Sequence, residues 1–380
     1  MRIINEIKKL FTIKSLIILG LISFIIWNLC IEFRLEYFPN GYPETTDLRV
    51  SEHLLEKYGT TLDDDELEDF KEETSLLEKD ADEYLLNDKD AQALGIKSYK
   101  EFKKASDEDM GKDERISNLR SKIMFEGNGY LFWELGSRER VLDQYSKDIG
   151  YNFSLEGKEK ERANEIQKSD QAMSVLDECV IDNYKELMYY FLLLVVITVA
   201  FVISPIFLRD NKNKVNFLQY SSITGRGLAK KKVIAAMITT FLMTTIELII
   251  LFGFYVQNNT LKFWECSINS KLNWGIYWFD LTFGEYVIIS IILMYMIAFL
   301  VASISLFVST KVKNYVALIG VQIPVLFVLI SFIRNYDLYS MTTIGYPKYT
   351  VIFGQSILMI VAIILLLLVL KQEKRRDILN

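Results

Sequence analysis

Apolar residues along the chain gather into six segments, each close to twenty residues long. One lies near the N-terminus and five crowd the second half, at 15–31, 187–208, 233–256, 286–309, 315–333 and 350–370. A helix needs roughly 20 apolar residues to cross a bilayer, and in lipid a helix satisfies its own backbone groups. The pattern predicts an α-helical integral membrane protein with six transmembrane helices.

Lysine and arginine gather beside alternate ends of these segments. The basic regions are the residues before 15, the segment 209–232, the turn at 310–314 and the tail after 370. Cytoplasmic loops carry an excess of Lys and Arg, so we expect both termini and the 209–232 segment on the inside. The Lys-, Asn- and Ile-rich composition indicates a bacterial chain, and hence a multi-pass protein of the bacterial plasma membrane.

The long polar stretch 32–186 is predicted to lie outside as an extracellular domain. Its acidic residues exceed its basic residues by about 18, although the net charge of the whole chain is only −6. Such a charge favours solubility and cationic partners without identifying a ligand. The apolar spacing predicts a mainly helical domain, with Tyr130–Trp133 as the one strand signal. The expected helices are 48–58, 63–86, 98–104, 116–135 and 157–184, the last running toward the second span.

Three smaller regions complete the predicted organisation. Residues 1–14 have the spacing of an amphipathic helix that lies in the membrane interface or simply anchors the topology. The first apolar segment lacks a small-residue cleavage site and is expected to remain as a span. The aromatic loop 257–284 suits an interfacial belt within the five-helix region 187–380. Three cysteines show no metal spacing, and a Cys179–Cys266 disulfide stays open.

Motifs for chemistry are missing from the chain. It has no GxxxxGK[ST] phosphate loop, no GxSxG nucleophile motif and a single histidine, so neither an enzyme nor a metal site is predicted. The acidic runs 63–66 and 107–111 lack the ligand spacing of a calcium loop. We interpret them as solvated helix N-termini.

Glu247 is the ionisable residue that stands inside a predicted span. A carboxyl group at that depth is costly and usually faces a bundle interior or a water-filled cavity. It could line a transport pathway, or it could be a buried carboxyl that is hydrogen-bonded to Ser or Thr on a neighbouring span. The sequence leaves both alternatives open.

The basic segment 209–232 carries the most specific pattern. A short amphipathic helix at 214–221 would present apolar residues, and a Gly-Arg-Gly break then leads to three lysines before the third span. Exposed apolar residues on such a helix indicate a protein partner. The residues expected to contact that partner are Val215, Phe217, Leu218, Tyr220, Gly225 and Arg226.

This pattern resembles the permease subunit of a type-2 ABC exporter, in the subset with a large outer domain between the first two spans. That family has six spans, both termini inside, an interfacial N-terminal helix and a coupling helix between spans two and three. The stretch 217–226, followed by 230–232, is similar to its coupling segment, although Ile223 stands where proline is common.

The resemblance implies a non-enzymatic permease that works with a separate cytosolic ABC ATPase. That ATPase would bind ATP and Mg²⁺, while this chain would hold no cofactor, pair with a second copy or a sister permease, and contact lipid but no nucleic acid. Peptides, antimicrobial peptides among them, and lipid-like molecules are the leading substrates for export. The alternative is a membrane sensor whose extracellular domain binds a ligand and whose inner loop reports to a partner.

Overall fold

A computed structural model describes residues 3–109, 111–127, 129–212, 225–333 and 342–375. Across these residues the chain is mostly helical and has no β-strand, and its isolated β-bridges include Thr61 with Ser174 and Ser267 with Thr282. Contacts divide the chain into two compact units, each built from separate stretches of sequence. Unit 1 comprises Met1–Phe38, Asn183–Leu261 and Glu285–Asn380, and unit 2 comprises Pro39–Asp182 and Lys262–Gly284.

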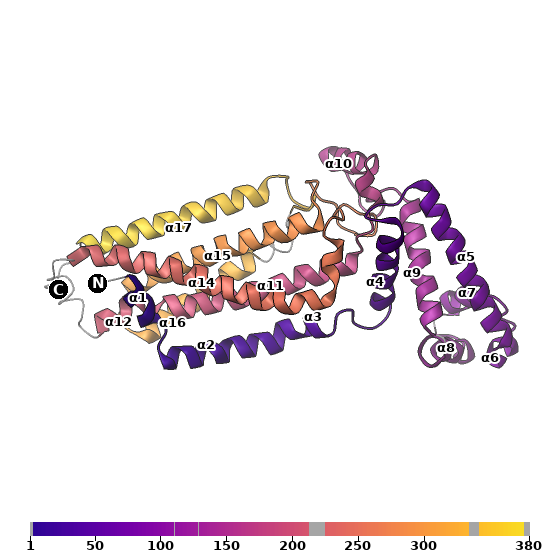
Figure 1. The fold of residues 1–380 in the computed structure, drawn as a ribbon, viewed down its shortest axis with the longest axis horizontal. Helices are drawn as coiled ribbons and strands as arrows, with labels where there is room; N and C mark the ends of the chain where they lie inside the picture. The colour runs from indigo at the N-terminus through magenta and orange to yellow at the C-terminus, as the bar shows by residue number, and fades with distance from the viewer. Residues whose placement is uncertain (1–2, 110, 128, 213–224, 334–341, 376–380) are drawn as a thin grey trace. The chain divides into compact units, whose positions relative to one another are not determined.

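Six helical stretches are long enough and apolar enough to cross a membrane, as the sequence predicted. They are Ile13–Glu36, Glu178–Asp210, Leu228–Asn258, Phe283–Lys311, Tyr315–Phe332 and Thr350–Arg375. In Figure 1 they correspond to α2 (Ile13–Ile26) with α3 (Glu32–Glu36), α11 (Glu178–Ile203) with α12 (Pro205–Lys212), α14 (Leu228–Tyr255), α15 (Phe283–Lys311), α16 (Tyr315–Ile333) and α17 (Thr350–Arg375). The fold class is therefore confirmed at the level of a helical chain with six candidate membrane spans.

Burial within unit 1 is uneven. Most of the apolar window of α11 is buried, whereas α2 and α17 bury little and run along opposite sides of the bundle in Figure 1. Their exposed residues are large and apolar, for example Phe24, Phe353 and Leu367. Apolar faces of this extent on a helical bundle are typical of lipid contact.

The N-terminal amphipathic helix is shorter than predicted. Helix α1 covers Ile3–Leu10, and Thr12 then caps α2. The Thr12 hydroxyl accepts a hydrogen bond from the Ser15 amide at 3.2 Å, and the Ser15 hydroxyl accepts one from the Thr12 amide at 2.8 Å. This reciprocal cap satisfies free amide groups at the start of α2. It therefore separates the two helices within the predicted range 1–14.

A proline break divides the second candidate span into α11 and α12. Pro205 has no amide hydrogen and its ring prevents the helix from continuing regularly. The next free amides, of Phe207 and Leu208, donate to the Ser309 hydroxyl of α15 at 3.2 and 3.3 Å. Ser309 thereby caps α12 from a neighbouring helix. The break therefore leaves fewer backbone amides without a hydrogen-bond partner.

Unit 2 is a helical domain. Its helices are α4 (Glu44–Tyr58), α5 (Asp64–Asn87), α6 (Lys89–Ala93), α7 (Tyr99–Asp109), α8 (Glu114–Ser121), α9 (Gly129–Ser146) and α10 (Gly157–Gln167). A core between α5, α7, α8 and α9 contains Leu85, Phe102, Leu119 and Phe132. The acidic run at 63–66 begins α5, where Asp63 and Glu66 form a capping box. The interpretation of that run as a helix N-terminus is thus confirmed.

Several expectations for the polar stretch are corrected. The acidic run at 107–111 does not begin a helix, because Asp107 and Asp109 lie in the last turn of α7. Tyr130–Trp133 is helical, in the first turns of α9. The helix predicted over 157–184 is interrupted between α10 and α11, because Ser174 and Val175 pair instead with Thr60 and Thr61. Residues 262–284, expected with the five-helix region, belong to unit 2.

The loop 262–284 is held in unit 2 by buried polar contacts. The Lys271 ammonium donates to the Tyr145 carbonyl at 3.0 Å, and the Arg162 guanidinium donates to the Tyr277 carbonyl at 2.9 Å. Tyr277 is fully buried, so it is not part of an interfacial aromatic belt. Cys30, Cys179 and Cys266 are all free.

Glu73 connects three helices of unit 2. Its carboxylate accepts hydrogen bonds from Lys57 of α4 at 2.6 Å and from Arg138 of α9 at 3.2 Å, and His53 Nε2 lies 2.8 Å away. Burial opposes ionisation of this carboxyl, but Lys57, His53 and Arg138 outweigh it, and its pKa lies below the usual 4.5. A lowered pKa stabilises the fold above pH 4.5, and this stabilisation is lost as the pH falls further.

We therefore expect Glu73→Gln to lower the melting temperature of the full chain in detergent at pH 7. The expected loss is roughly 2–4 °C, equivalent to about 1 kcal/mol for a domain of this size. The difference from wild type should shrink below about pH 4.5. Glu72→Gln, at an exposed neighbour, serves as the control. A difference that is equal at pH 7 and pH 4 would contradict the ionic role of Glu73.

Candidate functional site

The predicted partner-binding segment lies mostly outside the described residues. Val215, Phe217, Leu218 and Tyr220 fall within 213–224, which the structure does not describe. Gly225 and Arg226 are described only as part of a short 3-10 turn, Gly225–Gly227, where Gly225 has a φ of +39°. The structure thus locates the two flanks of the segment, α12 on one side and α14 on the other.

A buried ion pair joins these two flanks. Lys232 Nζ lies 2.6 Å from Asp210 Oδ2, and the two side chains are only 6% and 9% exposed. The Lys232 ammonium also lies 4.8 Å from the centre of the Phe207 ring, over its face. Removing one member of a buried pair leaves an uncompensated charge. The ion pair therefore fixes the end of α12 against the start of α14 on either side of 213–224.

Helix α1 packs at the same end of unit 1, against α14 (Figure 1). The Arg209 guanidinium donates to the Lys9 carbonyl, in the last turn of α1. Arginine suits this role because the last carbonyls of a helix lack partners and carry partial negative charge. Glu6, buried in α1, accepts from Lys9 at 2.8 Å. The N-terminal helix is consequently tied to the residue next to Asp210.

Glu247 lies on α14 within a row of polar side chains. Thr240, Thr244 and Glu247 recur at helical spacing on one face. Among the described residues, no hydrogen-bond partner is found for either threonine hydroxyl or for Glu247 Oε2, all of which are buried. Thr198 of α11 faces the carboxyl, but its hydroxyl donates to Leu194 and Val195 of its own helix. The two threonine hydroxyls and Glu247 Oε2 are therefore unsatisfied polar atoms inside the bundle.

A second polar chain connects three other helices of unit 1. The Ser204 hydroxyl, between α11 and α12, donates to Gln322 Oε1 of α16 at 2.5 Å, and Gln322 Nε2 donates to the Ser305 hydroxyl of α15 at 2.6 Å. All three side chains are buried. Each of these three side chains has a hydrogen-bond partner, in contrast with the threonine and glutamate row on α14.

One of these contacts is indicated by the sequence. Asp210 is the lone acid of the basic segment 209–232, which signals that it has a local basic partner. Which of seven lysines and arginines it pairs with depends on how α12 and α14 meet. The links Ser204–Gln322 and Ser309 to α12 had no such signal, because serine and glutamine are common in apolar helices.

Comparison with known proteins gives no match for this chain among protein-family models, curated proteins or solved structures. The six apolar helices are consistent with a multi-pass membrane protein. Among the described residues, no group of three or more His, Cys, Asp or Glu side chains has the arrangement of a metal site.

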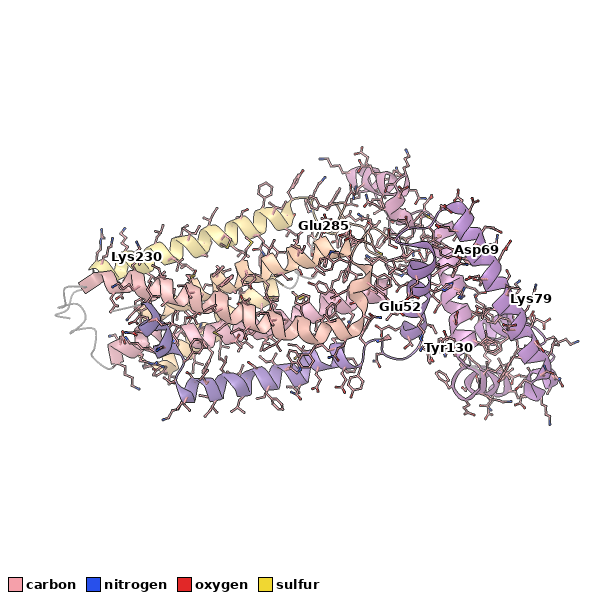
Figure 2. The ribbon with its side chains drawn as sticks, in the orientation of Figure 1. Glu52, Asp69, Lys79, Tyr130, Lys230 and Glu285 are labelled. Carbon is pink, nitrogen blue, oxygen red and sulfur yellow. The ribbon has the colours of Figure 1, made fainter. Side chains whose placement is uncertain are left out.

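We expect Lys232→Met to destabilise unit 1 strongly, by about 3–5 kcal/mol, because Asp210 would remain buried without its counterion. The measurement is thermal unfolding of the full chain in detergent. Lys230→Met removes an exposed lysine of the same cluster (labelled in Figure 2) and should have little effect. The double variant Asp210→Asn/Lys232→Met should be more stable than the sum of the two single changes predicts. Additive losses would show that the pair is not coupled.

Proposed function

We propose that this chain is the membrane-spanning permease subunit of an ATP-driven ABC exporter. In this proposal the six candidate spans are N-in and C-in, and unit 2 contains the extracellular domain. A separate cytosolic ATPase binds the segment 214–226, and two permease copies, or this chain and a sister permease, form the pathway. The exported substrate is a peptide, such as an antimicrobial peptide, or a lipid-like molecule.

The observation that carries the proposal is the buried ion pair that joins the two helices flanking the basic segment. The segment leaves one candidate span and enters the next, and the Asp210–Lys232 pair joins the two helices at 2.6 Å. A short loop needs no buried charge pair merely to connect two helices, and such a pair is costly to desolvate. A fixed connection between α12 and α14 is useful where a displacement of the segment must move both helices together.

The proposed mechanism follows from this connection between α12 and α14. ATP binding brings the two ATPase subunits together and moves the segments that contact them. Because Asp210 and Lys232 join α12 to α14, the displacement passes into both candidate spans. The ATP-bound arrangement drives the change only by binding one conformation of the permease more tightly than the other. The polar row at Thr240, Thr244 and Glu247 then offers a hydrated path within the bundle.

Replacing Phe217 and Leu218 with Asp should break co-purification with the ATPase, because the contact needs apolar side chains. The matched control is Asn216→Asp/Gln219→Asp, which adds the same charge to the same segment at polar positions. Retention of the ATPase by the control and its loss by the first variant support the coupling segment. Unchanged complex formation in both would sink this assignment.

Glu247→Gln should leave the complex assembled and change its ATPase activity in the presence of substrate, if the carboxyl lies on the pathway. Thr198→Val is the companion variant on α11, since it removes the hydroxyl that faces Glu247 without changing charge. Purified complexes in lipid vesicles give both the assembly and the ATPase readout. Wild-type activity of Glu247→Gln would favour a structural buried carboxyl.

The alternative is a membrane sensor, and one observation favours it. The chain passes between the two units four times, near residues 38, 182, 261 and 284. Ligand binding in unit 2 could therefore act on several helices of unit 1 without any transport. Isolation of the chain from its native membrane, with identification of the accompanying subunits, separates the two functions. An ABC ATPase supports export, and a kinase supports sensing.

A further inference from the structure

A groove of about 670 Å³ runs between α5 and α9 of unit 2. The two helices lie side by side in Figure 1, and Tyr130, at the start of α9, is labelled in Figure 2. Volumes of roughly 300–1,000 Å³ are typical of sites that hold small molecules or peptide side chains. The size of the groove is thus sufficient for a ligand.

One face of α5 forms a long wall of the groove. Its lining residues recur at helical spacing, namely Leu77, Asp80, Glu83, Tyr84 and Asn87, and Asp88 follows directly after the helix. The opposite wall is a short part of α9, with Tyr130, Leu131 and Glu134. Leu131 is buried, whereas Asp80 and Glu83 are exposed. The groove therefore has an apolar base and a carboxylate rim.

Charge in the groove is of one sign. Four carboxylates line it, and none of the lining residues is Lys or Arg. Two of the four are already neutralised from outside the groove, Asp88 by Lys122 at 2.8 Å and Glu134 by Arg138 at 2.9 Å. Asp80 and Glu83 have no ion-pair or hydrogen-bond partner for their carboxylates within the described part of the chain. Two negative charges are left for a ligand.

Aromatic side chains add a second kind of contact. Tyr84 is held by an edge contact with Phe132, with ring centres 5.6 Å apart. Tyr130 is 40% exposed and lies 5.1 Å from the Arg49 guanidinium, so its ring already accepts a cation on one face. Tyrosine rings attract lysine and arginine and also cover aliphatic chains.

The length of the groove selects an extended ligand. Leu77 and Asn87 are ten residues apart on α5, and a rise of 1.5 Å per residue gives a wall of about 15 Å. An extended peptide advances about 3.3 Å per residue, so about five residues fill that length. Asp80 and Glu83 are about 5–6 Å apart at Cβ, close to the roughly 6.6 Å between alternate side chains of an extended peptide.

We propose that the α5–α9 groove binds a basic peptide segment of about five residues, in which cationic side chains alternate with apolar ones. The cationic side chains meet Asp80 and Glu83, and the apolar ones lie against Tyr84, Tyr130 and Leu131. This inference concerns unit 2 alone and does not depend on transport or on an ATPase.

The test uses the full chain in nanodiscs of neutral phosphatidylcholine, so that lipid charge does not attract the probe. The probe is a fluorescent Lys-Leu-Lys-Leu-Lys peptide, followed by anisotropy. Asp80→Asn/Glu83→Gln should weaken binding about tenfold, as expected for two ion pairs of up to about 1 kcal/mol each. Asp65→Asn/Glu72→Gln removes the same charge from α5 outside the groove and should bind as wild type does.

Two further comparisons distinguish the groove from a general acidic surface. Tyr130→Ala keeps all the carboxylates and should also weaken binding, because one wall is lost. A Gln-Leu-Gln-Leu-Gln peptide should bind at least about tenfold more weakly than the basic one. Circular dichroism and thermal unfolding verify that each variant is folded.

Three results would overturn the inference. The first is equal affinity of wild type and Asp80→Asn/Glu83→Gln for the basic peptide. The second is equal weakening by the Asp65→Asn/Glu72→Gln control, which would indicate only a diffuse acidic field. The third is competition by spermidine at the same concentration as the peptide, which would assign the groove to small polyamines. None of them bears on the ATPase contact, so the exporter proposal stands or falls separately.

Discussion

Unit 1 depends on one constraint: polar groups placed inside an apolar helical bundle must find their partners on neighbouring helices. Water is not available in lipid to satisfy a freed amide or carbonyl. At Pro205 the helix breaks, and the Ser309 hydroxyl of α15 accepts hydrogen bonds from two amides that follow the break. Gln322 links Ser204 to Ser305 for the same reason. These contacts fix how α11, α15 and α16 pack, since apolar side chains alone would allow many arrangements.

The same constraint is stricter for charges, and it explains why the ends of α12 and α14 are joined. A buried Asp210 requires Lys232, and the neighbouring Arg209 binds the last turn of α1. Two consecutive residues of α12, Arg209 and Asp210, therefore link that helix to α1 and to α14. Glu247 is the contrasting case, because its Oε2 and the nearby threonines have no partners among the described residues. Buried polar groups without partners are costly, but they also occur elsewhere among the described residues, for example at Ser51, Asn183 and Thr239.

The sequence predicted well what depends on local pattern and poorly what depends on distant contacts. The six apolar helices and the Asp63–Glu66 cap follow from length, periodicity and residue type over a few positions. The run Tyr130–Trp133 is too short for its period to distinguish a strand from a helix. The interruption before α11 arises from pairing of Ser174 with Thr61, more than a hundred residues away. The inclusion of 262–284 in unit 2 rests on equally distant contacts, such as Lys271 with Tyr145.

The acidic excess of unit 2 shows how composition and structure differ as evidence for a partner. Many of its carboxylates are internal partners of lysine and arginine. Glu73 joins three helices, and Asp177 is buried against Arg140 at 2.5 Å. Their charge stabilises the fold and is not offered to a ligand. Asp80 and Glu83 are different because a groove with aromatic walls surrounds them and no basic residue lines it. The affinity for a cationic partner should therefore depend on these two residues far more than on the total charge of the domain.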